Sequence, residues 1–239
     1  MTTEKEIAGS SIETTAPDIP RSARNAFRKA FRRYFPLILI LWILFVLYPN
    51  PLKLPVSIHR FLNPNVDPVA VQPFLDDFPS DPVAIEQAVL ARIRYGLDWE
   101  LYGMPWYFPT VEETLERGQG DCKARALVLA SVLKAKDISS QVVSSPTHVW
   151  VDYEGKEQTS IENTQVQFYQ LDPETGERRF QIPQIRLSQL MNGWRAQLWT
   201  PMPTDRRVLL FTGLLGLVAA RVIFFNKRLL RATARKHSG

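Results

Sequence analysis

One thiol and one imidazole are the side chains best suited to chemistry in this sequence. Cys122 is the only cysteine and follows Gly118-Gln-Gly-Asp121, where a helix is predicted to begin. His148 is one of three histidines and opens a predicted strand. A thiol is a nucleophile only as its thiolate, which a helix N-terminus and a nearby imidazole both stabilise. The two residues predict a cysteine–histidine pair for nucleophilic catalysis.

The elements around this pair can be predicted from hydrophobic periodicity. Asp121 is a suitable cap for a helix from Cys122 to about residue 136, whose buried stripe has the three-four spacing of a helix. The stripe consists of Ala126, Leu129, Ala130 and Leu133. Short strands are predicted at 140–144, 147–153 and 158–168. A cysteine-bearing helix packed on an antiparallel sheet is an α+β fold.

A hairpin turn at Glu154-Gly-Lys156 suggests the third member of the site. With this turn as the tip, Glu162 or Asn163 lies near His148, and either side chain can accept a hydrogen bond from the ring. Cys122, as the first residue of its helix, has a free backbone N–H that can stabilise an oxyanion.

Sequence around these residues resembles the transglutaminase-like family. Gly-Asp-Cys122-x-x-x-Ala, then His148-Val-Trp-Val-Asp-Tyr, resembles its two sequence boxes, and Tyr107-Phe-Pro-Thr-Val-Glu-Glu-Thr-Leu resembles the lead-in of its bacterial membrane-anchored members. The resemblance covers roughly residues 95–170. It implies a papain-like fold with a Cys-His-Asp triad, the cysteine on a helix and the other two residues on adjacent strands.

The third triad residue departs from the family pattern. Where the family usually has Asp-Pro, this sequence has Ile161-Glu-Asn-Thr, so Glu162 takes the acid position. Asp172, in a Leu-Asp-Pro turn, is the second choice and Asn163 the third. Trp106, Tyr107 and Trp150 are expected to line the substrate groove, with core packing as the alternative for the first two.

Charge in this chain is unevenly distributed. Residues 54–205 carry 20 acidic and 13 basic side chains, whereas the basic clusters 21–33 and 227–239 contain no acid. Each cluster adjoins a 19-residue apolar run, 34–52 or 208–226, the second broken by Arg221. Such runs suit membrane helices, and cationic flanks stay cytoplasmic. We therefore expect a cell-membrane protein with two spans, cytoplasmic termini and an extracytoplasmic central domain. No nucleic-acid partner is expected.

The expected organisation has six parts. They are a cytoplasmic basic tail at 1–33, a first transmembrane helix at 34–53, a Pro-rich extended linker at 54–82, a transglutaminase-like domain at 83–205, a second transmembrane helix at 206–226 and a basic tail at 227–239. Asp81 is expected to cap a helix at 83–95, and Thr110 with Glu113 forms a predicted capping box.

The resemblance implies a thiol enzyme that acts on amide or peptide bonds through an acyl-enzyme, with hydrolysis favoured over cross-linking. Its expected partners are a peptide or protein substrate and the lipid bilayer. No metal site and no cofactor are predicted. The alternative is a catalytically silent module of the same fold that binds a partner at the cell envelope.

Overall fold

The computed structural model describes residues 21–162, 164–184 and 186–225 of this chain. Contacts divide the chain into two compact units, residues 41–213 and residues 1–40 with 214–239. The larger unit combines helices with a small antiparallel sheet, which confirms the α+β class. The predicted tail 227–239, the first twenty residues and Asn163 lie outside the described residues.

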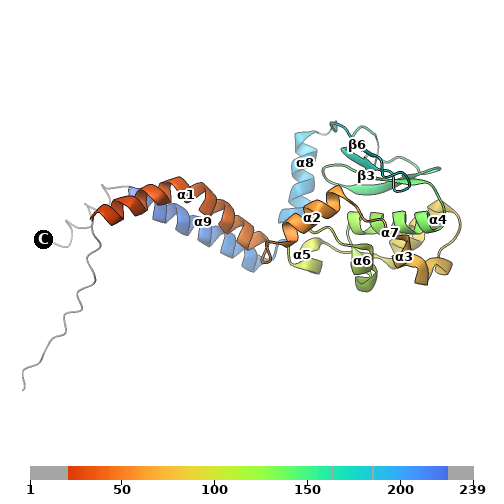
Figure 1. Cartoon of the computed structure of the whole chain (residues 1–239), viewed down its shortest axis with the longest axis horizontal. Coiled ribbons are helices and arrows are strands. Elements are labelled where there is room, and N and C mark those ends of the chain that lie inside the picture. The colour runs from red at the N-terminus through yellow and green to blue at the C-terminus, as the bar shows by residue number, and fades with distance from the viewer. Residues whose placement is uncertain (1–20, 163, 185, 226–239) are drawn as a thin grey trace, which may run out of the picture. The chain divides into compact units, whose positions relative to one another are not determined.

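Helix α7 (Cys122–Ala135) is the centre of the larger unit, and its bounds match the prediction closely. The sheet on one side of α7 has the order β4-β3-β5-β6, with all neighbours antiparallel. Its strands are β3 (Ser140–Ser144), β4 (Val149–Tyr153), β5 (Tyr169–Leu171) and β6 (Arg178–Phe180). The predicted stripe of α7 is buried. Because short helices cover its other side, α7 is also buried beyond that stripe (Figure 1).

Several short elements precede α7 in the chain. They are α2 (Lys53–Leu62), α3 (Pro68–Val71), the 3₁₀ helix η1 (Gln72–Asp77), α4 (Pro82–Arg92), β1 (Arg94–Tyr95), α5 (Asp98–Tyr102), α6 (Val111–Arg117) and β2 (Gln119–Gly120). Two predicted caps are confirmed. Asp81 accepts a hydrogen bond from the Ala84 N–H at the start of α4, and Thr110 with Glu113 forms the capping box of α6.

The Pro-rich segment 54–82 is not the extended linker that its composition predicts. It forms α2, α3 and η1, and its apolar side chains, including Phe61, Val71 and Phe78, join the core beneath α7. The prolines fit because Pro68 and Pro73 occupy first-turn positions, where a missing N–H costs nothing. The Asp67 carboxylate also caps α3, accepting from two backbone N–H groups.

The predicted strand at 158–168 is also wrong. Its described residues, 158–162 and 164–168, form turns, bends and irregular structure, and the strand that pairs with β3 on this side is β5, which begins at Tyr169. The loop is tied to its neighbours by isolated bonds, such as the Phe168 N–H to the Ser144 carbonyl at 2.7 Å. β3 therefore separates β4 from β5, and no hairpin forms at Glu154-Gly-Lys156.

Helix α1 (Arg21–Leu47) ends earlier than the predicted span 34–53, because Pro49 and Pro51 follow it. Among the described residues one helical stretch, Lys29–Leu47, is long and apolar enough to cross a membrane. The chain ends its described part with α8 (Leu187–Trp194), the π-helix η2 (Arg195–Trp199) and α9 (Thr204–Phe225). In the larger unit, Val46, Trp99 and Met202 form a small buried cluster.

Candidate active site

The start of α7 is held by a short parallel ladder. β2 pairs with β1, with Tyr95 opposite Gly120, so the chain enters the helix in a fixed direction. The Asp121 carboxylate then caps the helix through the Ala124 N–H at 3.4 Å. A Cβ on Gly120 would lie 2.4 Å from the Ala124 Cβ, so this approach requires glycine. The result is a half-buried Cys122 at the first helical position, where the backbone N–H has no acceptor within the helix.

A buried ion cluster lies next to the cysteine. The Lys123 ammonium donates to the Asp98 carboxylate at 2.6 Å and also contacts Asp121, and the Lys123 and Asp98 side chains are only 4% and 6% exposed. Burial raises the pKa of Asp98 to about 6, although the charge of Lys123 lowers it. The Asp98 carboxylate also accepts the Tyr107 N–H at 2.9 Å. The cluster therefore ties the start of α7 to α5 and to the loop after it.

His148 lies at the end of the loop between β3 and β4. The Ser145 side chain accepts the His148 N–H at 3.0 Å, and the Ser145 N–H donates to the His148 carbonyl at 2.8 Å. The imidazole is nearly parallel to the Trp150 ring, at 14° with centroids 6.0 Å apart. These contacts fix the backbone of His148 and one face of its ring.

Glu162 reaches the imidazole from the loop before β5. Its Oε1 lies 2.8 Å from His148 Nε2, which leaves Nδ1 as the ring nitrogen available to a second partner. Lys156 holds the other carboxylate oxygen at 3.4 Å and contacts Glu86 on α4 at 3.0 Å. The Tyr153 hydroxyl donates to the second oxygen of Glu86. A chain of charges therefore runs from the imidazole to α4.

The charges at the site change the protonation of its members. Burial lowers the pKa of His148, but hydrogen bonding and charge interaction with Cys122 and Glu162 outweigh burial and raise it from 6.5 to about 9. The hydrogen bond from His148 lowers the pKa of Glu162, burial opposes this effect, and the charge of Lys156 supports it. At neutral pH the site therefore contains an imidazolium and a carboxylate.

Cys122 and His148 border two cavities. The larger, about 480 Å³, lies beside Asp121, Lys123 and the loop before His148, and most of its lining surface is apolar. The smaller, about 120 Å³, is bordered by Tyr95, Arg125 and Glu162. Groups in either cavity can therefore reach the same two reactive side chains.

The remaining predicted residues fall in different places. Asp172 lies in the turn between β5 and β6, where its carboxylate accepts the N–H groups of Glu174 and Thr175. Trp106 borders the larger cavity and Trp150 the smaller.

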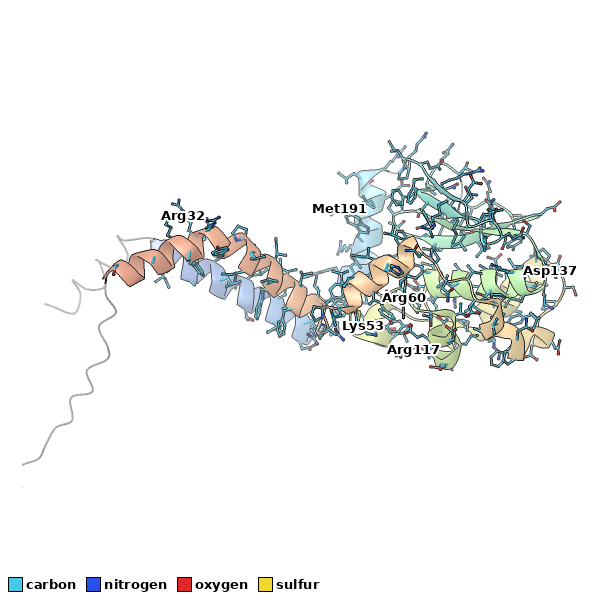
Figure 2. All side chains as sticks on the ribbon, in the orientation of Figure 1. Arg32, Lys53, Arg60, Arg117, Asp137 and Met191 are labelled. Carbon is cyan, nitrogen blue, oxygen red and sulfur yellow. The ribbon has the colours of Figure 1, made fainter. Side chains whose placement is uncertain are left out.

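Tyr107 borders neither cavity, because it is buried in contacts of its own. Its hydroxyl donates to Glu113 and accepts from Arg60, which is labelled on α2 in Figure 2. Of the two expectations for Tyr107, the structure therefore supports core packing and not a place in the groove.

Several residues of the site were not predicted. The sequence pattern places Lys156 in a turn and Lys123 on the helix that begins at the cysteine, and it predicts no role in the site for either. A lysine directly after a candidate nucleophile does indicate a positive charge near the thiol. The cavity residues Phe61, Phe168, Trp194 and Leu198 come from distant segments, and no local pattern indicates them.

Among residues 21–162, 164–184 and 186–225, no group of histidine, cysteine and acidic side chains is arranged to bind a metal ion. No protein-family model, no curated protein and no solved structure matches this chain. The chemistry of the site must therefore be inferred from its own geometry.

Proposed function

We propose that this protein is a membrane-anchored thiol enzyme of transglutaminase-like type that hydrolyses amide or peptide bonds. The observation that carries the proposal is the hydrogen bond between His148 and Glu162, in a site where the same imidazole interacts with Cys122. A thiol, an imidazole beside it and an acid that orients the imidazole are the three parts that thiol acyl transfer needs.

Each residue has a role in the proposed reaction. The Cys122 thiolate attacks the amide carbonyl and forms a C–S bond, and its backbone N–H stabilises the oxyanion. The His148 imidazolium gives its proton to the leaving nitrogen as the C–N bond breaks. Water then attacks the thioester while His148 takes its proton; the C–S bond breaks, which releases the carboxylic acid and restores the Cys122 thiolate and the His148 imidazolium. Glu162 keeps the ring oriented through Nε2.

The smaller cavity favours water as the second substrate. Its volume of about 120 Å³ has room for water, and it is bordered by polar groups of Glu86, Tyr95 and Glu162 that can hydrogen-bond water. The larger cavity has the size of an ordinary ligand site. A cavity with polar groups for water beside a larger cavity for the substrate supports hydrolysis as the proposed reaction.

Turnover of an activated ester tests the acyl-enzyme step. The detergent-solubilised full chain is mixed with p-nitrophenyl acetate, with and without a primary amine, and acetylation is followed by intact mass. We expect release of more than one equivalent of nitrophenol, an acetyl group on Cys122, and little transfer to the amine. Cys122→Ala should remove both signals, and His148→Ala should stop turnover after the first equivalent. Failure of the wild type to turn over would support the silent binding module instead.

We propose two membrane spans with both termini cytoplasmic. Support comes from the apolar stretch Lys29–Leu47 and from the basic clusters at the outer ends of both runs. The second span, 206–226, overlaps α9. Because Cys122 is the only thiol, a membrane-impermeant maleimide reports its side directly. Labelling in intact cells is expected, and labelling that requires lysis would contradict this topology.

A further inference from the structure

The larger cavity beside Cys122 has a lining suited to one kind of substrate. Five aromatic rings border it, from α2, the loop after α5, the segment before β5, and α8: Phe61, Trp106, Phe108, Phe168 and Trp194. Pro146, Val149 and Leu198 add aliphatic surface. A pocket of about 480 Å³ with this lining favours a large apolar group.

Charged groups at this cavity are already paired. Asp121 and Lys123 contact each other, and His148 is bonded to Glu162. The single Lys123 ammonium is shared by two carboxylates, Asp98 and Asp121, so among the described residues that border the cavity no cation remains unpaired to receive an acidic substrate group. An acidic side chain entering here would lose hydration without a cation to pair with, which is strongly unfavourable.

One wall of the cavity is supplied by α8 and η2 and is fixed to the histidine loop. Gln197 donates to the Thr147 carbonyl at 2.6 Å, and the Trp194 indole donates to the Pro146 carbonyl at 3.4 Å. A Cβ on Gly193 would lie 2.6 Å from the Thr147 side chain, so the helix approaches the loop closely. The wall is therefore in place before substrate binds.

We infer that the substrate is an amide or peptide whose acyl part carries a bulky, uncharged side chain, aromatic or large aliphatic, bound in this cavity. The inference rests on the proposed function, because it assumes that Cys122 attacks the carbonyl next to the bound side chain. Burial of such a side chain contributes roughly 1.5–3 kcal/mol, which corresponds to about a tenfold to hundredfold preference over glycine. An acidic side chain is disfavoured further.

Capped aminoacyl chloromethyl ketones test this specificity. In each probe the Cys122 thiolate displaces chloride, so a C–S bond forms as the C–Cl bond breaks. Labelling rates of the full chain in detergent are measured by intact mass for probes carrying Phe, Leu, Gly and Glu. Each rate is divided by that of iodoacetamide, which has no side chain to bind. We expect the Phe and Leu probes to label at least ten times faster than the Gly probe, and the Glu probe to be slowest.

Two tryptophans of similar exposure give a matched pair of variants. Trp194 borders the cavity and is 44% exposed, whereas Trp199 does not border it and is 39% exposed. Trp194→Ala should lower the Phe-to-Gly ratio at least threefold, and Trp199→Ala should leave that ratio unchanged. An equal fall in both variants would overturn the assignment of this wall.

Other outcomes separate the two proposals. If iodoacetamide labels Cys122 rapidly but the Phe probe is no faster than the Gly or Glu probe, the specificity inference is wrong and the thiol chemistry stands. If iodoacetamide labels the wild type no faster than His148→Ala, the proposed function fails whatever the probe ratio. A fatty-acyl chloromethyl ketone that labels faster than the Phe probe would overturn the peptide side chain in favour of a lipid chain.

Discussion

The two halves of the site are held by different interactions. The cysteine half depends on buried structure, with a capped helix, a ladder and the ion pair of Lys123 with Asp98. The histidine half depends on charges nearer the surface, where the His148 and Glu162 side chains are 23% and 18% exposed. Substitutions in the cysteine half are therefore expected to lower the free energy of unfolding. Substitutions in the histidine half are expected to change how stability and thiol reactivity depend on pH.

Loss of Lys123 is expected to have the largest effect. Lys123→Met leaves Asp98 and Asp121 without their cation, and breaking a buried pair costs about 3–5 kcal/mol. The lost stability is measured as the change in the free energy of unfolding of the full chain in detergent, followed by tryptophan fluorescence at pH 8. Because the unpaired Asp98 binds a proton more readily than in the unfolded chain, the loss should shrink as pH falls towards 5.

A second variant separates charge from packing at this pair. Asp98→Asn added to Lys123→Met removes one unpaired charge and should recover part of the lost stability. If Lys123→Met alone were as stable as the wild type, the buried pair would not stabilise the cysteine half.

The histidine half should show its stability through pH. The pKa of His148 is raised from 6.5 to about 9 in the folded chain, so its charged form stabilises the fold fully below pH 6.5, and this contribution is lost as pH rises through 9. At about 1.4 kcal/mol per pKa unit, the loss is at most roughly 3 kcal/mol. Melting temperatures between pH 6 and 10 should fall in this window, and His148→Ala should flatten the fall.

Lys156 tests whether the charge chain extends beyond the acid. Lys156→Met removes the cation that bridges Glu86 and Glu162, and we expect the free energy of unfolding to fall by about 1–2 kcal/mol. Since Lys156 helps to keep the pKa of Glu162 low, its loss should shift the acid limb of the thiol alkylation profile to higher pH. An unchanged acid limb would show that Lys156 has only a structural role.

The two candidate acids give the smallest and most selective comparison. Glu162→Gln keeps the shape of the side chain but removes its charge, and with it one of the interactions that raise the pKa of His148, so alkylation of Cys122 by iodoacetamide at pH 7 should slow several-fold. Asp172→Asn is the matched control and should leave the rate unchanged, because its carboxylate bonds within its own turn. Equal effects of the two substitutions would contradict the choice of Glu162.

The two halves also differ in how far the sequence predicts them. α7, β3 and the caps at Asp81 and Thr110 follow from local periodicity and capping rules, and the structure confirms them. Proximity of Glu162 to His148 was expected from a hairpin that does not form. The contact arises instead from a loop, where Thr159 and Glu162 exchange backbone hydrogen bonds.

Other parts of the site depend on long-range packing that local patterns do not contain. The Pro-rich segment was expected to be extended because of its composition, yet Phe61 on α2 packs near Trp106 and Tyr169. Trp194 reaches the cavity because η2 bonds to the histidine loop, far earlier in the chain. Such contacts depend on which segments pack together, and residue types alone do not specify this.

The alkylation rate of Cys122 by iodoacetamide, measured against pH in the wild type and in His148→Ala, tests the central claim most directly. The single thiol makes the signal unambiguous in the detergent-solubilised chain. A thiolate–imidazolium pair predicts rapid alkylation of the wild type already at pH 6–7 and at least tenfold slower alkylation of the variant there. Slow alkylation that rises only above about pH 8.5, as for an ordinary thiol, and equal rates in the two proteins would contradict a cysteine–histidine active site.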